Sequence, residues 1–246
     1  MTTAAGITRL RAGADAVGAR ARLVRHAQAS WGSADYDRLS ELGHTQSQHL
    51  ARWLAADPVE YKHVIRGSLR RHLQTLDIVS AAFAAAGRAL PTARVDPDWN
   101  EFDHEPVLRA YAAAHPHDQH VPLARAGDTL ALRNLLGSAL QAWRDGKLDA
   151  QVPETWNAFG ERVARARERI ADAPGTVLII TSGGVMWRCA QAALDLDDAG
   201  LIAANLSLRN TAISEFERVA ERWRMLSWNE LPHLAASEHA HLHSHF

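Results

Sequence analysis

Two side chains suited to phosphoryl chemistry stand together at the end of a short apolar run. The segment Arg22–Ser30 passes through Leu23 and Val24, reaches Arg25-His26, and then turns at once to small and polar residues. Arginine presents a planar fork of donors that matches a phosphate group, and histidine offers a nitrogen nucleophile or a general base. The pattern is typical of a buried strand that delivers functional side chains to the carboxyl edge of a sheet.

Other polar candidates follow other predicted strands. The turn Gly67–Arg71 follows the apolar pair at 64–65, Thr181–Gly184 follows the run 176–180, and Glu101 follows Val95. The carboxyl ends of strands meet at one edge of an open α/β sheet, so we expect these groups to lie together. Two arginines would grip a phosphoryl group, the histidine would attack phosphorus, and the carboxyl group would protonate the departing oxygen. This scheme requires neither a metal ion nor another cofactor.

Alternating helix and strand patterns can position these groups. Ser40 leads into a helix that ends at Asp57-Pro58, and a second helix begins near Leu69 and closes at Gly87. Leu73 in the second helix and Leu130 in a later one are predicted to face the core. The arginines of the helix at 154–170 alternate with glutamates, which predicts a solvated face. The remaining predicted elements are strands at 22–25, 64–65, 95 and 176–180, helices at 127–143 and 183–194, and a hairpin at 212–219 and 223–228.

The composition fits one large α/β domain or two small ones, and one domain is predicted because no internal repeat or linker divides the chain. The chain has 246 residues, of which 47% are hydrophobic and 22% charged, and its net charge is −1. This balance gives no field for nucleic acid or acidic membrane, and the longest apolar run, Val177–Ile180, is far too short to span a bilayer. The single cysteine, Cys189, excludes an internal disulfide and indicates a reducing, cytoplasmic location. The sequence leaves a homodimer open.

Both ends of the chain differ from the domain between them. Residues 1–20 are rich in alanine and arginine, which predicts a flexible extension, with a transit peptide as the alternative. Residues 235–246 carry alternating histidines at 239, 241, 243 and 245, which predict a disordered tail or, alternatively, a metal ligand set. The domain itself is placed at 21–234, with 102–153 as an insertion.

Six segments resemble the histidine phosphatase superfamily, the group that includes cofactor-dependent phosphoglycerate mutases. They match that family in its own order over residues 21–234, which is more specific than any one motif. Residues 23–30 resemble its Arg-His-Gly signature, with Ala27 where glycine is usual, and residues 69–75 resemble Leu-x-Arg-Ala-x-Gln-Thr, which selects Arg71 rather than Arg70. The other matches are Leu39–Gln46, Trp99–Phe102, Asn210–Phe216 and Asn229–Leu234.

The resemblance implies a phosphoglycerate mutase-like fold. That fold is a three-layer α/β/α sandwich around a mostly parallel sheet, with 102–153 as a helical cap over the site. The implied activity is metal-independent hydrolysis of a small phosphate ester or phosphorylated substrate through a phosphohistidine on His26. Arg25 and Arg71 would hold the phosphoryl group, Glu101 would act as acid and then as base, and Gln28 and Ser30 would line the pocket.

One position departs from the family pattern. The family has Ser-His-Gly-Gly after the core strand, whereas this chain has Thr181-Ser182-Gly183-Gly184, with Ser182 in place of a histidine that donates to phosphoryl oxygens. Serine keeps a donor but is shorter and uncharged. Loss of one such donor costs about 100- to 1,000-fold in rate, so Ser182→His is expected to raise activity. The amides of Gly183 and Gly184 could still bind an anion, and His104 or His72 could reach this place.

Two other functions stay open from the sequence. A phosphoglycerate mutase is disfavoured because the loop after Ser30 lacks the longer stretch with Asn and Gly-Trp of those enzymes. A non-catalytic sensor of phosphate ligands is the alternative from another class, and Ser182 is the argument for it. Each candidate residue also has a structural interpretation: Arg25 paired with a buried acid, His26 in the core, Arg71 on a helix surface, Glu101 as a cap, and His104 or His72 facing solvent.

Overall fold

The computed structural model describes residues 17–30, 35–197 and 207–245. Its centre is one six-stranded sheet with the order β3-β2-β4-β1-β5-β6. Neighbouring strands from β3 to β1 are parallel, whereas β5 and β6 are antiparallel to their neighbours. The sheet is therefore mixed, with its parallel part where the site was predicted. The strands are β1 Val17–Arg25, β2 Tyr61–Arg66, β3 Arg94–Val95, β4 Thr176–Thr181, β5 Ile213–Val219 and β6 Arg222–Glu230.

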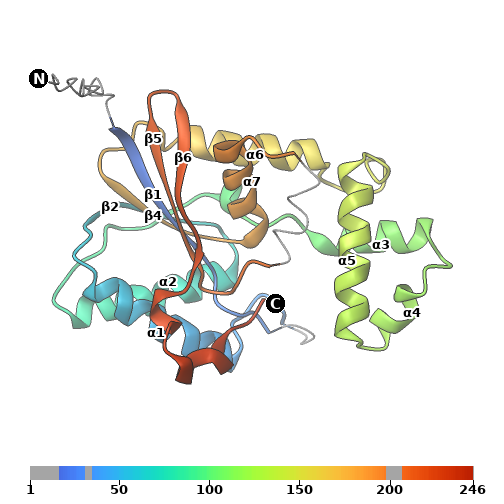
Figure 1. The fold of residues 1–246 in the computed structure, drawn as a ribbon, viewed down its shortest axis with the longest axis horizontal. Helices are drawn as coiled ribbons and strands as arrows, with labels where there is room; N and C mark the ends of the chain where they lie inside the picture. Colours follow the sequence, from blue (N-terminus) through green and yellow to red (C-terminus); the bar gives the residue numbers. More distant parts are fainter. Residues whose placement is uncertain (1–16, 31–34, 198–206, 246) are drawn as a thin grey trace, which may run out of the picture.

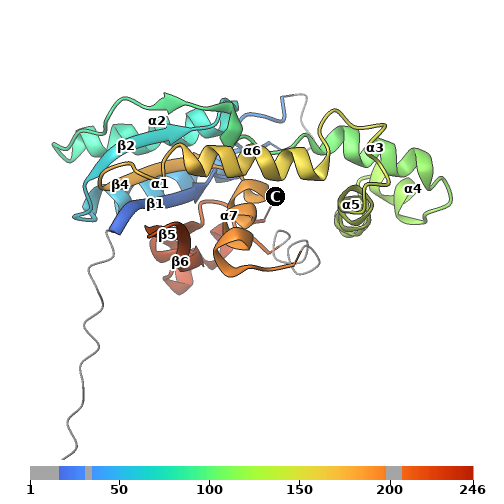
Figure 2. The ribbon, with the colours of Figure 1, turned by 90° about the horizontal axis from the view of Figure 1, so that it is seen from above.

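Helices cover both faces of the sheet, as Figures 1 and 2 show. One face carries α1 (Glu41–Ala56) and α2 (Arg70–Ala85), and the other carries α6 (Trp156–Glu168) and α7 (Gly183–Leu194). Each helical layer has its own hydrophobic cluster, because successive strand residues point to opposite faces. The predicted three-layer α/β/α architecture is confirmed.

The insertion forms a separate group of helices beside the sheet. Both views place α3 (His104–Ala114), α4 (His120–Arg125) and α5 (Thr129–Arg144) to one side of the three layers. Aromatic rings join this group to the domain: Trp143 lies 4.8 Å from Phe102 and 5.2 Å from Trp156 between ring centroids. Large buried rings supply much apolar area, so they fix the insertion firmly to the sandwich.

The ends of the helices follow the predicted signals. Ser40 Oγ accepts from the Gly43 amide at 3.0 Å and caps α1, and Asp57 before Pro58 ends that helix. Gly87, just past α2, has a φ of 68°, which glycine adopts at little cost. The assignment of inward faces was less accurate, because Leu73 is 37% and Leu130 is 65% exposed. Both lie in the first turn or so of their helices, where the apolar stripe runs out.

The two ends of the domain differ from the prediction. Val17–Arg20 belong to β1, and residues 1–16, assigned to the extension, lie outside the described residues. The predicted disordered tail is wrong for Ser237–Leu242, which forms a 3-10 helix. Leu242 is 6% exposed, and its carbonyl accepts from Gln46 Nε2 of α1 at 2.6 Å, so burial and a hydrogen bond order the segment.

The described residues offer neither a cluster of metal ligands nor a membrane-spanning helix. Within them, no group of three or more histidines, cysteines or carboxylates is arranged to hold a metal ion. The helices of the described parts include none that is both long and apolar enough to cross a membrane.

Candidate active site

Three adjacent parallel strands end side by side at the site. Arg25 is in register with Thr181, and Arg66 with Ile180, so β1, β2 and β4 stop at one level. Backbone bonds continue past these ends, since the His26 amide donates to the Thr181 carbonyl at 2.8 Å. The following turns therefore present their side chains to one region, as expected at the carboxyl edge of a parallel sheet.

His26 is held in one protonation form. The ring is 5% exposed, and Nδ1 lies 2.7 Å from the Ala27 carbonyl oxygen, which can only accept, so Nδ1 carries the proton. Nε2 is then bare, and it accepts from Arg71 Nε at 3.1 Å. Burial lowers the pKa of His26 well below 6.5, and the nearby Arg71 guanidinium lowers it further. His26 is thus a neutral imidazole whose free nitrogen faces a cation.

The backbone around His26 is fixed by residues of the other family-like segments. The Ala27 amide donates to Thr75 Oγ1 at 3.2 Å. The His26 carbonyl accepts from Asn210 Nδ2 at 3.3 Å and from the Thr211 amide at 3.4 Å. Ala27 is not among the described residues with positive φ, so its methyl group is tolerated where the family has glycine.

Arg71 is oriented by a loop whose role the sequence did not reveal. Its Nη1 donates to Asp37 Oδ1 at 2.6 Å, and its guanidinium lies 5.4 Å from the centre of the Tyr36 ring. The other oxygen of Asp37 accepts from the Arg70 amide at 2.7 Å, at the start of α2. One signal could have suggested such a partner: Leu69, the residue before α2, has no side-chain acceptor for the first amides.

Glu101 is held at the start of α7. Its Oε2 accepts from the Gly184 amide at 3.0 Å, and Oε1 accepts from the Phe102 amide at 3.2 Å. Burial raises the pKa of Glu101, and the Gly184 amide partly opposes this shift. A Cβ on Gly184 would lie 2.1 Å from Glu101 Oε1, so only glycine admits the carboxyl group here. The Gly184 amide, expected to bind phosphate, therefore binds the carboxyl group instead.

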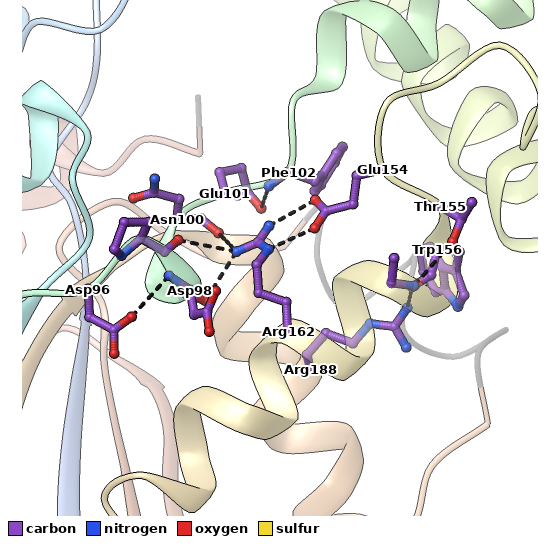
Figure 3. A network of polar contacts seen from close by, with 12 residues as sticks. Asp96, Asp98, Asn100, Glu101, Phe102, Glu154, Thr155, Trp156, Arg162 and Arg188 are labelled. Atoms are coloured by element: carbon purple, nitrogen blue, oxygen red, sulfur yellow. Dashed lines mark hydrogen bonds and ion pairs between the residues drawn. The ribbon is translucent and has the colours of Figure 1, made fainter.

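Arg162 of α6 supports the segment that carries Glu101 (Figure 3). Its Nε and Nη2 donate to the two carboxylate oxygens of Glu154 at 2.7 and 2.9 Å. Its Nη1 donates to the carbonyls of Asp98 and Asn100 at 3.1 and 2.9 Å. The prediction of a solvated arginine face is thus wrong for Arg162, whose side chain is 15% exposed. Charge-assisted bonds of this kind fix the backbone just before the acid.

Ser182 and His72 form a buried pair beside the nucleophile. Both are 0% exposed, and Ser182 Oγ lies 2.7 Å from His72 Nε2. The His72 and His26 ring centroids are 5.5 Å apart. His104, the other histidine considered for this place, instead packs edge-on against Tyr36 at 5.6 Å. Of the two histidines, the structure brings His72 to Ser182, so the solvent-facing interpretation of His72 is wrong, whereas the role suggested for His104 stays a prediction.

Arg25 lies near the other groups but donates to backbone. Its Nη1 donates to the Leu208 carbonyl and its Nη2 to the His245 carbonyl, the latter at 2.9 Å. Its Nε is buried and has no hydrogen-bond partner among the described residues. Burial lowers the pKa of Arg25 to about 10, against the opposing influence of Glu101. The predicted phosphate contact of Arg25 stays a prediction.

A cavity of about 720 Å³ lies next to this region. The predicted pocket residues Gln28 and Ser30 line it, and Gln28 Oε1 accepts from Ser40 Oγ at 2.7 Å. Thr129 of the insertion lines it as well, whereas His104 does not. The remaining wall carries charges of both signs together with polar and apolar side chains: Arg38, Ser40, Glu41, His44, Arg70, Gln74, Ala29 and Leu39.

Comparisons with known proteins place these features in a family. The model of the histidine phosphatase superfamily (branch 1) matches residues 22–127 and 127–231. A phosphoglycerate mutase from Bacillus anthracis str. Sterne has a similar structure, with 14% identity, a TM-score of 0.61, and coverage of 88% of this chain and 95% of that one. Mycobacterial glucosyl-3-phosphoglycerate phosphatase is similar at 20% identity and a TM-score of 0.57, with coverage of 86% and 99%.

A third similar structure is a phosphoserine phosphatase variant from Entamoeba histolytica, in complex with phosphoserine. It shares 13% identity with this chain at a TM-score of 0.58, and the match covers 88% of this chain and 99% of that one. A search of curated protein sequences gave no significant match. At these identities the structural matches establish the fold, and it is the phosphoglycerate mutase-like fold that the sequence predicted.

Proposed function

Because the chain belongs to the histidine phosphatase superfamily, we propose that it hydrolyses phosphomonoesters without a metal ion, through a phosphohistidine on His26. The observation that carries this proposal is the contact between Arg71 Nε and the bare Nε2 of His26 at 3.1 Å. If a phosphoryl group is bound between these two atoms, its phosphorus faces the nucleophile His26 Nε2 and its oxygens face the Arg71 guanidinium.

In the first step, His26 Nε2 forms a bond to phosphorus as the bond from phosphorus to the ester oxygen breaks. The proton on Glu101 moves to that oxygen, so an alcohol leaves and a carboxylate remains. The raised pKa of Glu101 suits an acid that must hold its proton until this moment. The proton stays on Nδ1 of His26 and is donated in a hydrogen bond to the Ala27 carbonyl, which stabilises the phosphorylated ring.

In the second step, water attacks phosphorus and the bond to Nε2 breaks. Glu101, now a carboxylate, takes a proton from that water, and inorganic phosphate and the neutral imidazole are released. Each group thereby returns to its starting state. Arg71 would balance the negative charge of the phosphoryl oxygens in both steps. Arg25 would be a second donor once its guanidinium turns away from the backbone carbonyls of Leu208 and His245.

The substrate is proposed to be a small phosphate ester or a phosphorylated side chain. Arg38 and Arg70 lie in the wall of the cavity beside the site, which favours a substrate with further oxygens or negative charge. The cap residue Thr129 reaches the same cavity, so the insertion would contribute to substrate choice. No nucleic acid or membrane partner is proposed.

The test is a panel of phosphate esters assayed in the presence of a chelator, with His26→Ala alongside. We expect phosphate release by the wild-type protein, none by the variant, and an acid-labile phosphoryl adduct on His26 after rapid quenching. Hydrolysis retained by His26→Ala would overturn the proposal. Micromolar binding without turnover would support the sensor, and transfer between two positions of a phosphoglycerate would support the mutase.

A further inference from the structure

The pair formed by His72 and Ser182 has no role in the steps described above. It lies next to the nucleophile, because Ser182 follows Thr181, whose carbonyl accepts from the His26 amide at 2.8 Å. Both side chains are fully buried. Burial of a polar pair has a cost that bulk apolar side chains would avoid, so its place beside a reactive nitrogen calls for a chemical explanation.

The surroundings of His72 decide which of its nitrogens carries the proton. Nε2 lies 2.7 Å from Ser182 Oγ, whereas Nδ1 is buried and has no partner among the described residues. An unpaired buried N–H is rarer than an unpaired acceptor, which favours the proton on Nε2. His72 then donates to Ser182 Oγ, and the hydroxyl hydrogen of Ser182 is left to point elsewhere. The pair thus ends in a free donor.

We propose that His72 and Ser182 together form a donor relay for the phosphoryl group, in which Ser182 Oγ–H donates to a phosphoryl oxygen and His72 Nε2–H donates to Ser182 Oγ. This inference rests on the proposed function. Hydrogen bonds in such a chain polarise one another, so the serine hydroxyl becomes a stronger donor than it would be alone. Ser182 would contact the substrate, and His72 would act through it as a positioning residue.

The relay involves two positions at which this chain differs from the family pattern. In that pattern the alanine of Leu-x-Arg-Ala-x-Gln-Thr stands at position 72 and the histidine of Ser-His-Gly-Gly at position 182. This chain has histidine at the first position and serine at the second. In the relay, the imidazole that the family pattern has at the start of α7 is supplied by the first turn of α2, and Ser182 connects it to the phosphoryl group. On this view the departure at Ser182 is compensated.

The backbone near His72 is built to admit the ring. A Cβ on Gly67 would lie 2.3 Å from His72 Nδ1 and 2.7 Å from its Cε1, so glycine is needed where the imidazole passes. His72 also follows Arg71 directly, at the start of α2. Two consecutive residues thereby reach two sides of the same site: Arg71 contacts His26 Nε2, and His72 contacts Ser182.

The relay reverses one expectation from the sequence. Ser182→His alone was expected to raise the rate, but Ser182 Oγ already lies in contact with the His72 ring. A second imidazole at 182 would overlap the first and displace it. We therefore expect Ser182→His alone to lower activity, and the combination His72→Ala/Ser182→His, which clears the space, to restore most of it.

The experiment measures hydrolysis and inhibitor binding for His72→Ala, Ser182→Ala, the double alanine variant and the combined variant. Ser182→Ala should lose about 100- to 1,000-fold in kcat. His72→Ala should lose less, because the serine donor remains, and the double variant should lose no more than Ser182→Ala, because His72 acts only through Ser182. Vanadate, which mimics the pentacoordinate transition state, should bind more weakly in proportion, whereas inorganic phosphate should bind nearly as before. Ser47→Ala is the control for Ser182→Ala, since Ser47 of α1 is also a fully buried serine but its Oγ has no hydrogen-bond partner among the described residues.

The outcomes separate the relay from both a structural role and the proposed function. Loss of kcat without recovery in His72→Ala/Ser182→His, or the same loss in Ser47→Ala, would overturn the relay. The relay would also be overturned if the loss of kcat in the double alanine variant equalled the product of the two single losses. The same holds if His72→Ala unfolds and Ser182→Ala, which removes only the hydroxyl, keeps full activity. If His26→Ala retains hydrolysis, the proposed function is refuted. If His26→Ala is inactive but the His72 and Ser182 variants keep full activity, only the relay is refuted.

Discussion

Replacing Gly184 by alanine should disable the general acid and leave the protein folded. The new Cβ would lie 2.1 Å from Glu101 Oε1, against at least 3.4 Å for an ordinary contact, so the carboxyl group must move by about 1.3 Å. A misplacement of about 1 Å can cost roughly 100-fold in rate, and general acid catalysis is worth about 100- to 10,000-fold in total. We therefore expect at least about a 100-fold loss with a substrate that needs the proton.

The effect on stability should be small by comparison. Gly184 is in the first turn of α7, where alanine is favoured over glycine by up to about 1 kcal/mol. Forcing a methyl group into a packed site costs about 1–3 kcal/mol. The net loss in the free energy of unfolding is then at most about 3 kcal/mol, which most domains tolerate because their stability is about 5–15 kcal/mol.

The assay compares an alkyl phosphate with 4-nitrophenyl phosphate. An alkoxide is a poor leaving group and needs the proton, whereas nitrophenolate leaves readily without it, so the loss should be far larger with the alkyl ester. Gly160→Ala in α6 is the control, since its Cβ would meet only the flexible end of Arg188, at 3.2 Å. Equal losses with both esters, or none with either, would refute the placement of Glu101 as the acid.

Three further predictions concern the groups around the nucleophile. Burial lowers the pKa of His26 and raises that of Glu101, so kcat/KM for an alkyl ester should rise as pH falls through the pKa of Glu101 and decline only at still lower pH. Glu101→Gln should abolish the pH dependence on the basic side of this profile. An alkaline optimum in the wild-type protein would contradict the prediction. Asp37→Asn should raise KM by about 10-fold, because the charge-assisted hydrogen bond that it weakens, between Asp37 and Arg71, is worth about 1.5–3 kcal/mol. Inhibition by inorganic phosphate should weaken in parallel, and unchanged inhibition would contradict this role of Asp37. Arg162→Lys should lower Tm by several degrees and reduce activity, because lysine cannot make the two-bond contact with the Glu154 carboxylate and also donate to both backbone carbonyls. An unchanged Tm by calorimetry would show that these Arg162 contacts are dispensable.

Local signals in the sequence predicted the elements well. Ser40 and Gly87 mark helix ends through side-chain and backbone chemistry that acts over a few residues, and the structure has both where expected. The apolar run at 176–180 likewise became the central strand β4. Exposed leucines such as Leu73 show the limit, since a helical stripe indicates the buried face only where another element covers it.

The finer contacts of the site depend on distant parts of the chain. His72 and Ser182 are 110 positions apart, and no local pattern indicates that they touch. The partner of Arg71, Asp37, lies 34 positions away in a loop whose polarity suggested only exposure. Arg25 shows the reverse: its side chain was predicted to face phosphate, but its hydrogen bonds go to two backbone carbonyls.

The place of β1 within the sheet has a consequence for how the protein is made. The strand that ends just before His26 pairs on one side with β4 and on the other with β5, both more than 150 positions later in the chain. A nascent polypeptide that ends before them leaves β1 with two open edges, which is a template for self-association. Such long-range pairing also slows folding, so we expect yield during expression to depend on chaperones and temperature more than the native contacts would suggest.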